Sequence, residues 1–379
     1  MIHDSTELFY PERWTTNPPY ASSISLSNPT APFSNPWLGY PGGNPFPGAA
    51  IFPVSGVYVT IPPDVHATYE LKWNVSYQRQ FGADWRASVN YLGTKTNHIL
   101  GAREINEAQN YLPGATTGNT NQRRITYLIN PAQGQYYASI VQTDDGNIAN
   151  YNGLLLSLEH RFSKNFTWLV NYTWSRCMST YDFGGELAGN NYQDPNNRRA
   201  EYGPCNFNRT QIFNTSLVVI SPGAGHGAAK YLTKDWKVSP IISAYTGQPF
   251  SVTDGGTDIS LTGVGADRPN VVMTGPDVLP HTTTAWFNPA AFARQPAGTF
   301  GNSGRDNITA PGAYNWDMAV SREFHPTERM RLEFRADVFN VLNHANWNAP
   351  TASITSAQFG QITSFGAPRL MQGALKLYF

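Results

Sequence analysis

Two cysteines, Cys177 and Cys205, are the only thiols in the sequence, and they bracket a connection between two predicted strands. Outside the cytosol, in an oxidising compartment, such a pair can form a disulfide at the base of the loop. The alternative is a pair of unbonded thiols. We expect the disulfide, which in the chain-entropy treatment would stabilise the fold by about 3 to 4 kcal/mol.

Acidic side chains gather in two glycine-containing segments, TDDGN at residues 143–147 and VTDGGTD at residues 252–258. Carboxylate and carbonyl oxygens can bind Ca²⁺, but neither segment has the ligand spacing of an EF-hand. Asp-Gly pairs form turns more often than they bind metal. We therefore interpret both segments as turns.

The sequence has no local motif for catalysis. Its eight histidines are scattered, with no HExxH and no pair at positions i and i+4, so we expect no zinc site. A nucleophile elbow of the GxSxG type and a phosphate-binding glycine loop are both absent. A pair of catalytic carboxylates of the glycosidase type has no local sequence motif, so the sequence does not test for it. We expect no enzyme, no cofactor and no bound metal.

Aromatic residues are the most distinctive part of the composition, at 13% of the chain against 14% charged residues. Exposed rings in a proline-rich N-terminal stretch can stack on a ligand or pack the loops. These candidate ligand contacts are Tyr10, Trp14, Tyr20, Trp37 and Tyr40. Tryptophans near strand ends suit an interfacial girdle better than a binding platform. They are Trp73, Trp85, Trp168, Trp174, Trp236 and Trp316.

The net charge of the chain does not indicate a class of partner, because 26 Lys and Arg balance 26 Asp and Glu. A nucleic-acid-binding protein would show a clustered basic excess, so we expect no such partner. The mean hydropathy is −0.39, and no apolar run approaches the ~18 residues of a membrane helix. The N-terminus does not resemble a secretory signal peptide. We expect the chain to be an incomplete piece of a longer protein.

Apolar and polar residues alternate in long segments, as in strands that have one apolar and one polar face. We expect an all-β fold in which residues 1–68 are an extracellular loop region and residues 69–379 form about nine antiparallel strands. The expected strands lie at residues 69–81, 84–96, 152–163, 165–178, 209–221, 235–252, 315–324, 329–343 and 369–379.

The connections between these strands alternate in length. Three tight turns, FGAD, SKN and HPTE, and one modest turn contrast with long linkers at 97–151, 179–208, 253–314 and 344–368. Outer-membrane barrels have this asymmetry, with short periplasmic turns and long extracellular loops. The final alternating strand, with Leu375, Leu377 and Phe379 on one face, is similar to the C-terminal signal that the barrel-assembly machinery reads. Its usual glycine is shifted, with Ala374 nearest that place.

Four blocks resemble the C-terminal region of Oar-like TonB-dependent outer-membrane receptors, which carry a carboxypeptidase-regulatory-like domain. The blocks are WNVSYQRQFGADWRASVNYLGTKTNH, YNGLLLSLEHRFSKNFTWLVNYTWSR, SAYTGQPFSV and FRADVFNVLNHANW. The resemblance implies a barrel of about 22 strands in the bacterial outer membrane, filled by a plug that contacts TonB. The plug, the TonB-contacting segment and the signal peptide have no matching positions in this sequence.

Two functions follow as alternatives. The first is the partial barrel of a transporter that takes up an unidentified small molecule or glycan, with outer-membrane lipid, TonB and the barrel-assembly machinery as partners. The second is a secreted or surface all-β protein that binds carbohydrate or acts as an adhesin. They differ in whether aromatic strand faces such as Phe166, Trp168, Val170 and Tyr172 contact lipid or pack against another sheet.

Overall fold

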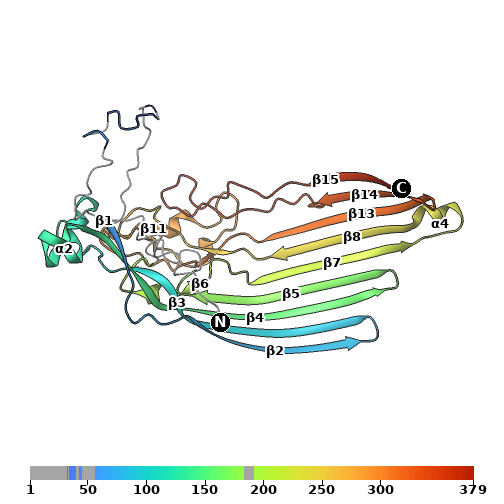
Figure 1. The fold of residues 1–379 in the computed structure, drawn as a ribbon, viewed down its shortest axis with the longest axis horizontal. Coiled ribbons are helices and arrows are strands. Elements are labelled where there is room, and N and C mark those ends of the chain that lie inside the picture. Colours follow the sequence, from blue (N-terminus) through green and yellow to red (C-terminus); the bar gives the residue numbers. More distant parts are fainter. Residues whose placement is uncertain (1–31, 33, 40–41, 45–55, 183–191) are drawn as a thin grey trace.

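The computed structural model describes residues 32, 34–39, 42–44, 56–182 and 192–379. Nine long strands form one sheet in the order β15-β14-β13-β8-β7-β5-β4-β3-β2, and all neighbours on this path are antiparallel (Figure 1). Their bounds are β2 Tyr69–Phe81, β3 Trp85–Glu104, β4 Tyr137–Ser163, β5 Phe166–Ser179, β7 Gln211–Pro222, β8 Lys234–Tyr245, β13 Ala313–Thr327, β14 Met330–Phe339 and β15 Leu370–Tyr378.

Short strands and helices accompany the nine long strands. The strands are β1 Gly56–Thr60, β6 Gly203–Pro204, β9 Pro249–Phe250, β10 Asn270–Val271, β11 Phe292–Ala293 and β12 Ile308–Thr309. The helices are α2 Ile125–Ile129, α3 Pro131–Gly134 and α4 Ala228–Thr233, with 3₁₀ turns at Thr117–Asn119, Asn121–Arg123, Arg198–Glu201, Pro276–Val278 and Pro289–Ala291. Within the described residues, none of the helices has the length and apolar character needed to cross a membrane.

The nine strands predicted from alternation are confirmed, with corrections at their ends. The linker predicted at 97–151 is shorter, because β3 and β4 continue as a paired hairpin out to Glu104 and Val141. Irregular register near Ile99 breaks the alternation there and hid the extension from the sequence pattern. At the other strands, β8 ends at Tyr245 rather than 252, and β14 ends at Phe339 rather than 343.

Local backbone chemistry explains where β14 stops. Asn340 has φ +52°, a left-handed conformation that asparagine tolerates and that ends the strand. Its side-chain Nδ2 donates to the carbonyl oxygen of His344 at 2.9 Å, and its Oδ1 accepts from the His344 backbone N–H at 2.9 Å. The side chain therefore replaces strand pairing with a local turn.

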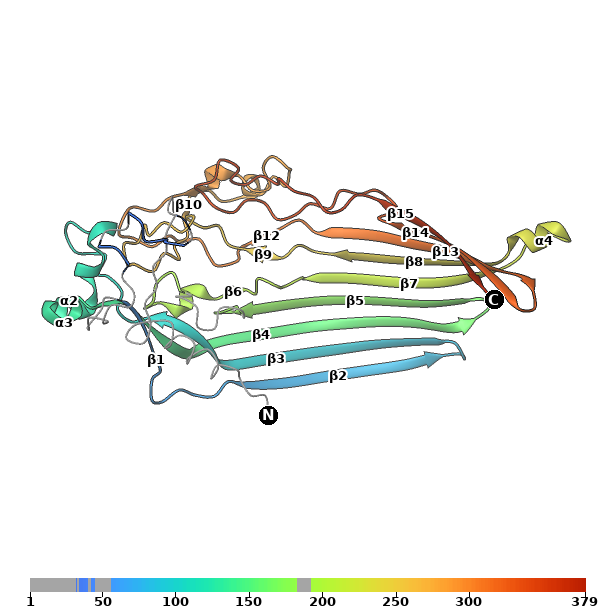
Figure 2. The same ribbon diagram turned by 45° about the horizontal axis from the view of Figure 1, so that its top comes forward.

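The tight turns gather at one end of the sheet, together with the C-terminus, and the long connections gather at the other (Figure 2). Between β4 and β5, Lys164 and Asn165 have φ +48° and +68°. Two consecutive positive φ angles are typical of the two-residue hairpin turn that matches strand twist. Between β7 and β8 the chain instead forms α4.

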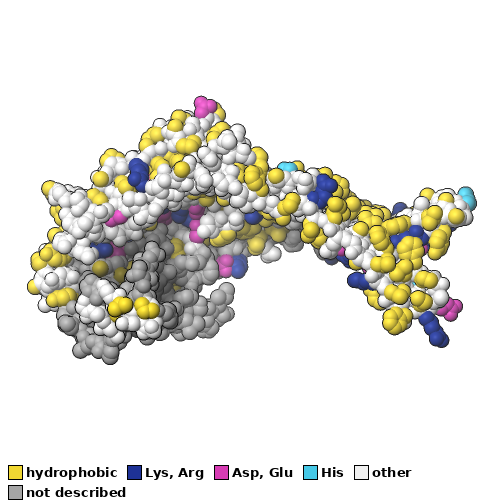
Figure 3. All heavy atoms as spheres, turned by 90° about the horizontal axis from the view of Figure 1, so that it is seen from above, with side chains coloured by type: hydrophobic (Ala, Val, Ile, Leu, Met, Phe, Trp, Pro, Cys, Tyr) yellow, Lys and Arg dark blue, Asp and Glu magenta, His cyan; other side chains and the backbone are white. Residues whose placement is uncertain are grey.

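The register aligns all apolar strand faces on one side of the sheet. Val75 pairs with Tyr91, Tyr91 with Leu154, and Leu154 with Trp174. The same face continues across β13, β14 and β15, where Phe334 pairs with Leu375. Apolar side chains gather along the strands on the right of Figure 3. The sheet thus has one largely apolar face, on which Arg79 and Arg322 lie toward the short turns.

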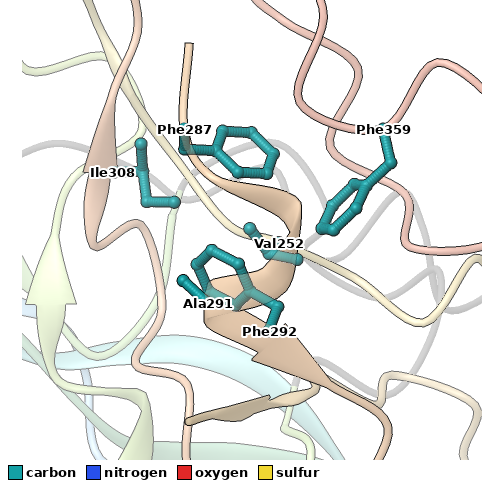
Figure 4. Packing of buried hydrophobic residues seen from close by; sticks show 6 residues of the cluster. All are labelled: Val252, Phe287, Ala291, Phe292, Ile308 and Phe359. Atoms are coloured by element: carbon teal, nitrogen blue, oxygen red, sulfur yellow. The ribbon is translucent and has the colours of Figure 1, made fainter. Parts of the chain in front are cut away.

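The buried apolar core lies in the long connections rather than under the sheet. Phe287 is fully buried, and its ring centroid lies 5.0 Å from that of Phe359 and 5.5 Å from that of Phe292 (Figure 4). Val252, Ala291 and Ile308 complete the cluster. Edge-to-face ring packing of this kind holds the connection after β8 against the connection after β14.

Candidate functional site

The second face of the sheet is polar and carries charges of both signs. On β14, Arg335 Nε donates to both carboxylate oxygens of Asp337 at 3.0 Å. From the edge strand, Gln372 Nε2 donates to Asp337 Oδ2 at 3.2 Å, and the Tyr378 hydroxyl donates to Glu333 Oε2 at 3.1 Å. A face that keeps paired charges along a strand requires water or polar partners.

A cavity of about 790 Å³ opens where this polar face meets the long connections. Asp317 lies in its wall, where its Oδ1 accepts from Asn315 Nδ2 at 2.7 Å and from the Asn340 backbone N–H at 2.8 Å. The lining also includes Trp347 and Arg209. Amides, one guanidinium and aromatic rings around one cavity suit a polar organic solute that has an apolar face.

A buried ion pair stands beside a second cavity of about 440 Å³. Arg268 donates from Nη1 to Glu201 Oε2 at 2.7 Å and from Nη2 to Glu201 Oε1 at 3.0 Å. The Gln193 backbone N–H also donates to Glu201 Oε1, at 3.0 Å. The pair joins two different long connections, so it fixes how they meet at this end of the sheet.

Arg305 is the centre of the neighbouring network. Its Nε donates to the Glu201 carbonyl oxygen at 2.7 Å, and its guanidinium contacts the carboxylates of Asp182 and Asp306. Burial, together with the adjacent Asp182 carboxylate, raises the pKa of Asp306 to about 7, although Ser251 and Arg305 act in the opposite direction. The cluster thus contains a carboxyl group that ionises near neutral pH.

A third network ties the β4 extension to the connection after β5. The Tyr192 hydroxyl donates to Asp144 Oδ2 at 2.5 Å, and Arg198 Nε donates to the same oxygen at 2.7 Å. Asn147 Nδ2 donates to the Tyr192 oxygen at 2.6 Å. Burial and the Asp144 carboxylate raise the pKa of Tyr192, so the phenol stays neutral.

The disulfide between Cys177 and Cys205 is present in the structure, with Cα atoms 5.4 Å apart. It joins the end of β5 to the connection that returns toward β7, and the Cys205 backbone N–H donates to the Cys177 carbonyl oxygen at 3.1 Å. Asn208 Oδ1 also accepts from the Cys177 N–H at 2.9 Å. The base of this loop is therefore held covalently and by hydrogen bonds.

The turn interpretation is wrong for the first acidic segment and confirmed for the second. Residues 143–147 lie inside β4, at an irregularity of its pairing, rather than in a free turn. In the other segment, Asp258 accepts from the backbone N–H groups of Thr262 at 3.1 Å and Gly263 at 2.9 Å, which is turn stabilisation. Asp254 is fully buried, and burial raises its pKa.

The predicted ligand-contacting aromatics mostly lie outside the described residues. Tyr10, Trp14, Tyr20 and Tyr40 belong to that part, whereas Trp37 is described and half-buried. At the other end of the chain, Leu375 and Leu377 are exposed on the apolar face of β15, and Phe379 is fully exposed.

The strand tryptophans all lie on the apolar face, in two groups. Toward the short turns, Trp85 packs 4.5 Å from the His160 ring, Trp168 donates from Nε1 to Thr215 Oγ1 at 2.8 Å, and Trp236 donates to the Leu232 carbonyl oxygen at 2.8 Å. Trp73, Trp174 and Trp316 lie toward the long connections, and the first two are about half exposed. Two bands of amphipathic rings are the arrangement found at membrane interfaces.

Two histidines that the sequence analysis did not single out meet Asp145, a residue of the first acidic segment, in the fold. His66, His98 and Asp145 each place a potential metal-ligating atom within 4.8 Å of the other two. They are far apart in sequence, so the search for local histidine spacing did not find them. Only the pairing of the strands that carry His98 and Asp145 would have indicated the contact.

Comparison with known protein families decides the class. The family model described as "Outer membrane beta barrel domain" matches residues 1–372. The chain belongs to this family. An outer-membrane β-barrel domain places its apolar face in lipid, its polar face inward, its short turns in the periplasm and its long loops outside the cell. No curated protein matches the sequence.

Solved structures similar to this barrel domain are distant. The outer-membrane transporter YddB from Escherichia coli is 9% identical, with a TM-score of 0.49 over 86% of this chain and 34% of that one. The FrpB iron transporter from Neisseria meningitidis is 10% identical, with a TM-score of 0.40 over 84% and 33%. The ferripyoverdine receptor from Pseudomonas aeruginosa is 9% identical, with a TM-score of 0.41 over 82% and 27%. The chain spans about a third or less of their lengths.

Proposed function

We propose that this chain is the C-terminal part of the barrel of an Oar-like TonB-dependent outer-membrane transporter that takes up an unidentified ligand. The observation that carries the proposal is the polar face, which runs from the cavity beside Asp317 down strands such as β14 toward the short turns. On the opposite side, the same strands present a largely apolar face. This combination supports a passage with a wet wall and a lipid-facing exterior.

The sheet supports a barrel that further strands complete. Among the described residues, β2 and β15 are the two edges of the sheet, and both are exposed along their whole lengths. An open edge offers unpaired backbone groups, which cannot stay unpaired in lipid. Nine strands are also too few for a transporter barrel of about 22. We propose that the remaining strands, the plug and the TonB contact belong to other parts of the protein.

We propose that ligand capture takes place among the long loops and in the cavity of about 790 Å³. Residues 1–68 would add an extracellular loop region to this barrel portion at 69–379, with Tyr10, Trp14, Tyr20, Trp37 and Tyr40 as further ring contacts. A small molecule or a glycan fits the amide and aromatic lining. Leu375, Leu377 and Phe379 would contact the barrel-assembly machinery, and the exposure of these side chains in and just after β15 supports this role.

A solute-depletion experiment tests the transport proposal. The encoding bacterium, a deletion of the gene and a deletion of tonB are grown on the same complex medium, and the spent media are compared by mass spectrometry. We expect the same solutes to remain in the medium in both deletions. If the gene deletion depletes every solute as the parent strain does, or if only the tonB deletion has an effect, the proposal is wrong.

A loop variant then tests whether the cavity takes part. Trp347→Ala in the chromosomal gene should slow depletion of those solutes several-fold, because the ring lines the cavity. The matched control is Tyr111→Ala, which removes a loop ring that is 74% exposed and does not line that cavity. Equal depletion rates in the two variants would contradict the assignment of the cavity.

A further inference from the structure

Three side chains from three separate segments meet at the edge of the sheet beside β2. His66 comes from the link between β1 and β2, His98 from β3 and Asp145 from β4. His66 Nδ1 lies 2.7 Å from Asp145 Oδ2, and His98 Nδ1 lies 3.9 Å from the same oxygen. The two imidazole rings stack with centroids 4.8 Å apart. His98 Nδ1 lies closer, at 3.2 Å, to the backbone carbonyl oxygen of Asp145, so only His66 is within hydrogen-bond distance of the carboxylate while both imidazoles face the same aspartate.

The backbone at this point departs from regular pairing in a way that aims the side chains together. His98 has φ +55° and lies between the paired residues Asn97 and Ile99, where the register shifts. On the facing strand, Asp145 lies between the paired residues Asp144 and Asn147. Bulges of this kind redirect side chains and are common at functional sites.

We propose that His66, His98 and Asp145 bind one divalent transition-metal ion of the zinc class, with the remaining coordination positions open to water. Two imidazoles and one carboxylate are ligands that Zn²⁺ accepts in open tetrahedral sites, and imidazole also suits Cu²⁺ and Ni²⁺. These three side chains would fill three of the four positions of such a tetrahedral site.

The separations fit a metal after small side-chain rotations. Metal–ligand distances of about 2.0 to 2.1 Å in a tetrahedron place neighbouring ligand atoms about 3.3 Å apart. The two measured separations of 2.7 and 3.9 Å lie on either side of this value. The His66 and His98 side chains are 65% and 34% exposed, so both rings have room to rotate. The metal would replace the proton shared by His66 and Asp145.

The position of the site separates it from the transport passage. His98 packs against Tyr69, with ring centroids 5.6 Å apart, and Tyr69 belongs to the apolar outer face. The cavity beside Asp317 lies on the inner face near β13 and β14, toward the other edge of the sheet. The ion would tie the segment before β2 to the β3–β4 hairpin. This inference therefore stands independently of the proposed transport function.

Calorimetric titration of the metal-free, folded protein in detergent with ZnCl₂ tests the site. We expect one ion to bind, and we expect His98→Ala and Asp145→Asn to weaken binding at least tenfold. The matched control is His325→Ala, which removes an exposed histidine at the short-turn end and should bind zinc like the wild type. Absence of binding to the wild type, or equal loss in the control, overturns the proposal.

A second variant keeps the test decisive if a strand substitution prevents folding. His66→Ala changes a residue in the link before β2, outside any strand, and should leave the nine-strand sheet folded, as judged by its β-sheet circular dichroism. We expect the same loss of zinc binding, and loss of the visible absorption of bound Co²⁺. A folded His66→Ala protein that binds one zinc ion as tightly as the wild type also overturns the proposal.

Discussion

Arg268 and Glu201 form a two-point ion pair, with Nη1–Oε2 at 2.7 Å and Nη2–Oε1 at 3.0 Å, between side chains that are 7% and 0% exposed. The residues are 67 positions apart. The pair lies in the loop end of the molecule, where the buried groups exclude water and an unpaired charge is costly. The ion pair therefore holds the connection after β5 against the connection after β8.

Removing one partner of this ion pair should loosen the contact between the connections after β5 and β8 while the strands stay paired. Glu201→Gln leaves the Arg268 guanidinium buried without its counter-charge, which typically costs about 3 to 5 kcal/mol. We expect faster amide hydrogen exchange across residues 193–204, measured by mass spectrometry. The control Glu328→Gln changes an exposed turn carboxylate and should alter nothing. Unchanged exchange in Glu201→Gln would show that the ion pair does not hold the loops.

The ion pair also shows where sequence reasoning stops. Alternation is a local property, so the faces of segments such as Phe166–Ser179 follow from the residues alone. The buried networks are different, because their partners are distant in the sequence. Glu201 and Arg268 are 67 positions apart, and Asp144 and Arg198 are 54 positions apart. No spacing rule connects such residues. Only the fold brings them together.

The same limit explains the missed cluster of histidines. His66 and Asp145 are 79 positions apart, and His98 and Asp145 are 47 apart. Regular alternation predicted the β3–β4 hairpin but not its bulged extension, which is where His98 and Asp145 lie. The bulges break the period of two that the prediction relied on.

The assignment of lipid and lumen faces can be tested at two consecutive residues. Val170 lies on the apolar face with Leu158 and Thr215, whereas Asn171 lies on the polar face. Val170→Arg should destabilise the folded protein in lipid vesicles by about 2 to 4 kcal/mol, because it buries a charge in hydrocarbon. Asn171→Arg is the matched control and should cost far less. Urea unfolding in vesicles measures both, and equal destabilisation would refute the face assignment.

The carboxyl group of Asp306 predicts a pH dependence of the loop end. Burial and Asp182 raise its pKa to about 7 in the folded protein, above the value of about 3.9 in an unfolded chain. The folded state therefore binds the proton more tightly, and stability falls as pH rises from about 4 to 7 and is level above that. Loop cleavage by chymotrypsin should accelerate over this range.

A substitution tests whether the Asp306 carboxyl group causes this pH dependence. Asp306→Asn removes the titrating carboxyl, while its amide oxygen can still accept from Ser251 Oγ, the partner of Oδ1 at 2.8 Å. The cleavage rate should then change little between pH 5 and pH 8, after correction for the activity of the protease on a peptide substrate. Asp277→Asn, at an exposed loop position, should keep the wild-type profile. A wild-type profile in Asp306→Asn would rule out this carboxyl as the cause.

The open edges of the sheet lead to a prediction about pores. β2 pairs only with β3, and β15 only with β14, within the described part of the chain. A polar face that is not closed into a ring cannot seal a water-filled passage against lipid. The purified chain, added to planar bilayers, should therefore give no stable single-channel conductance. Discrete, long-lived conductance steps from this chain would mean that the two edges close on each other or on a second copy, and the partial-barrel proposal would fail.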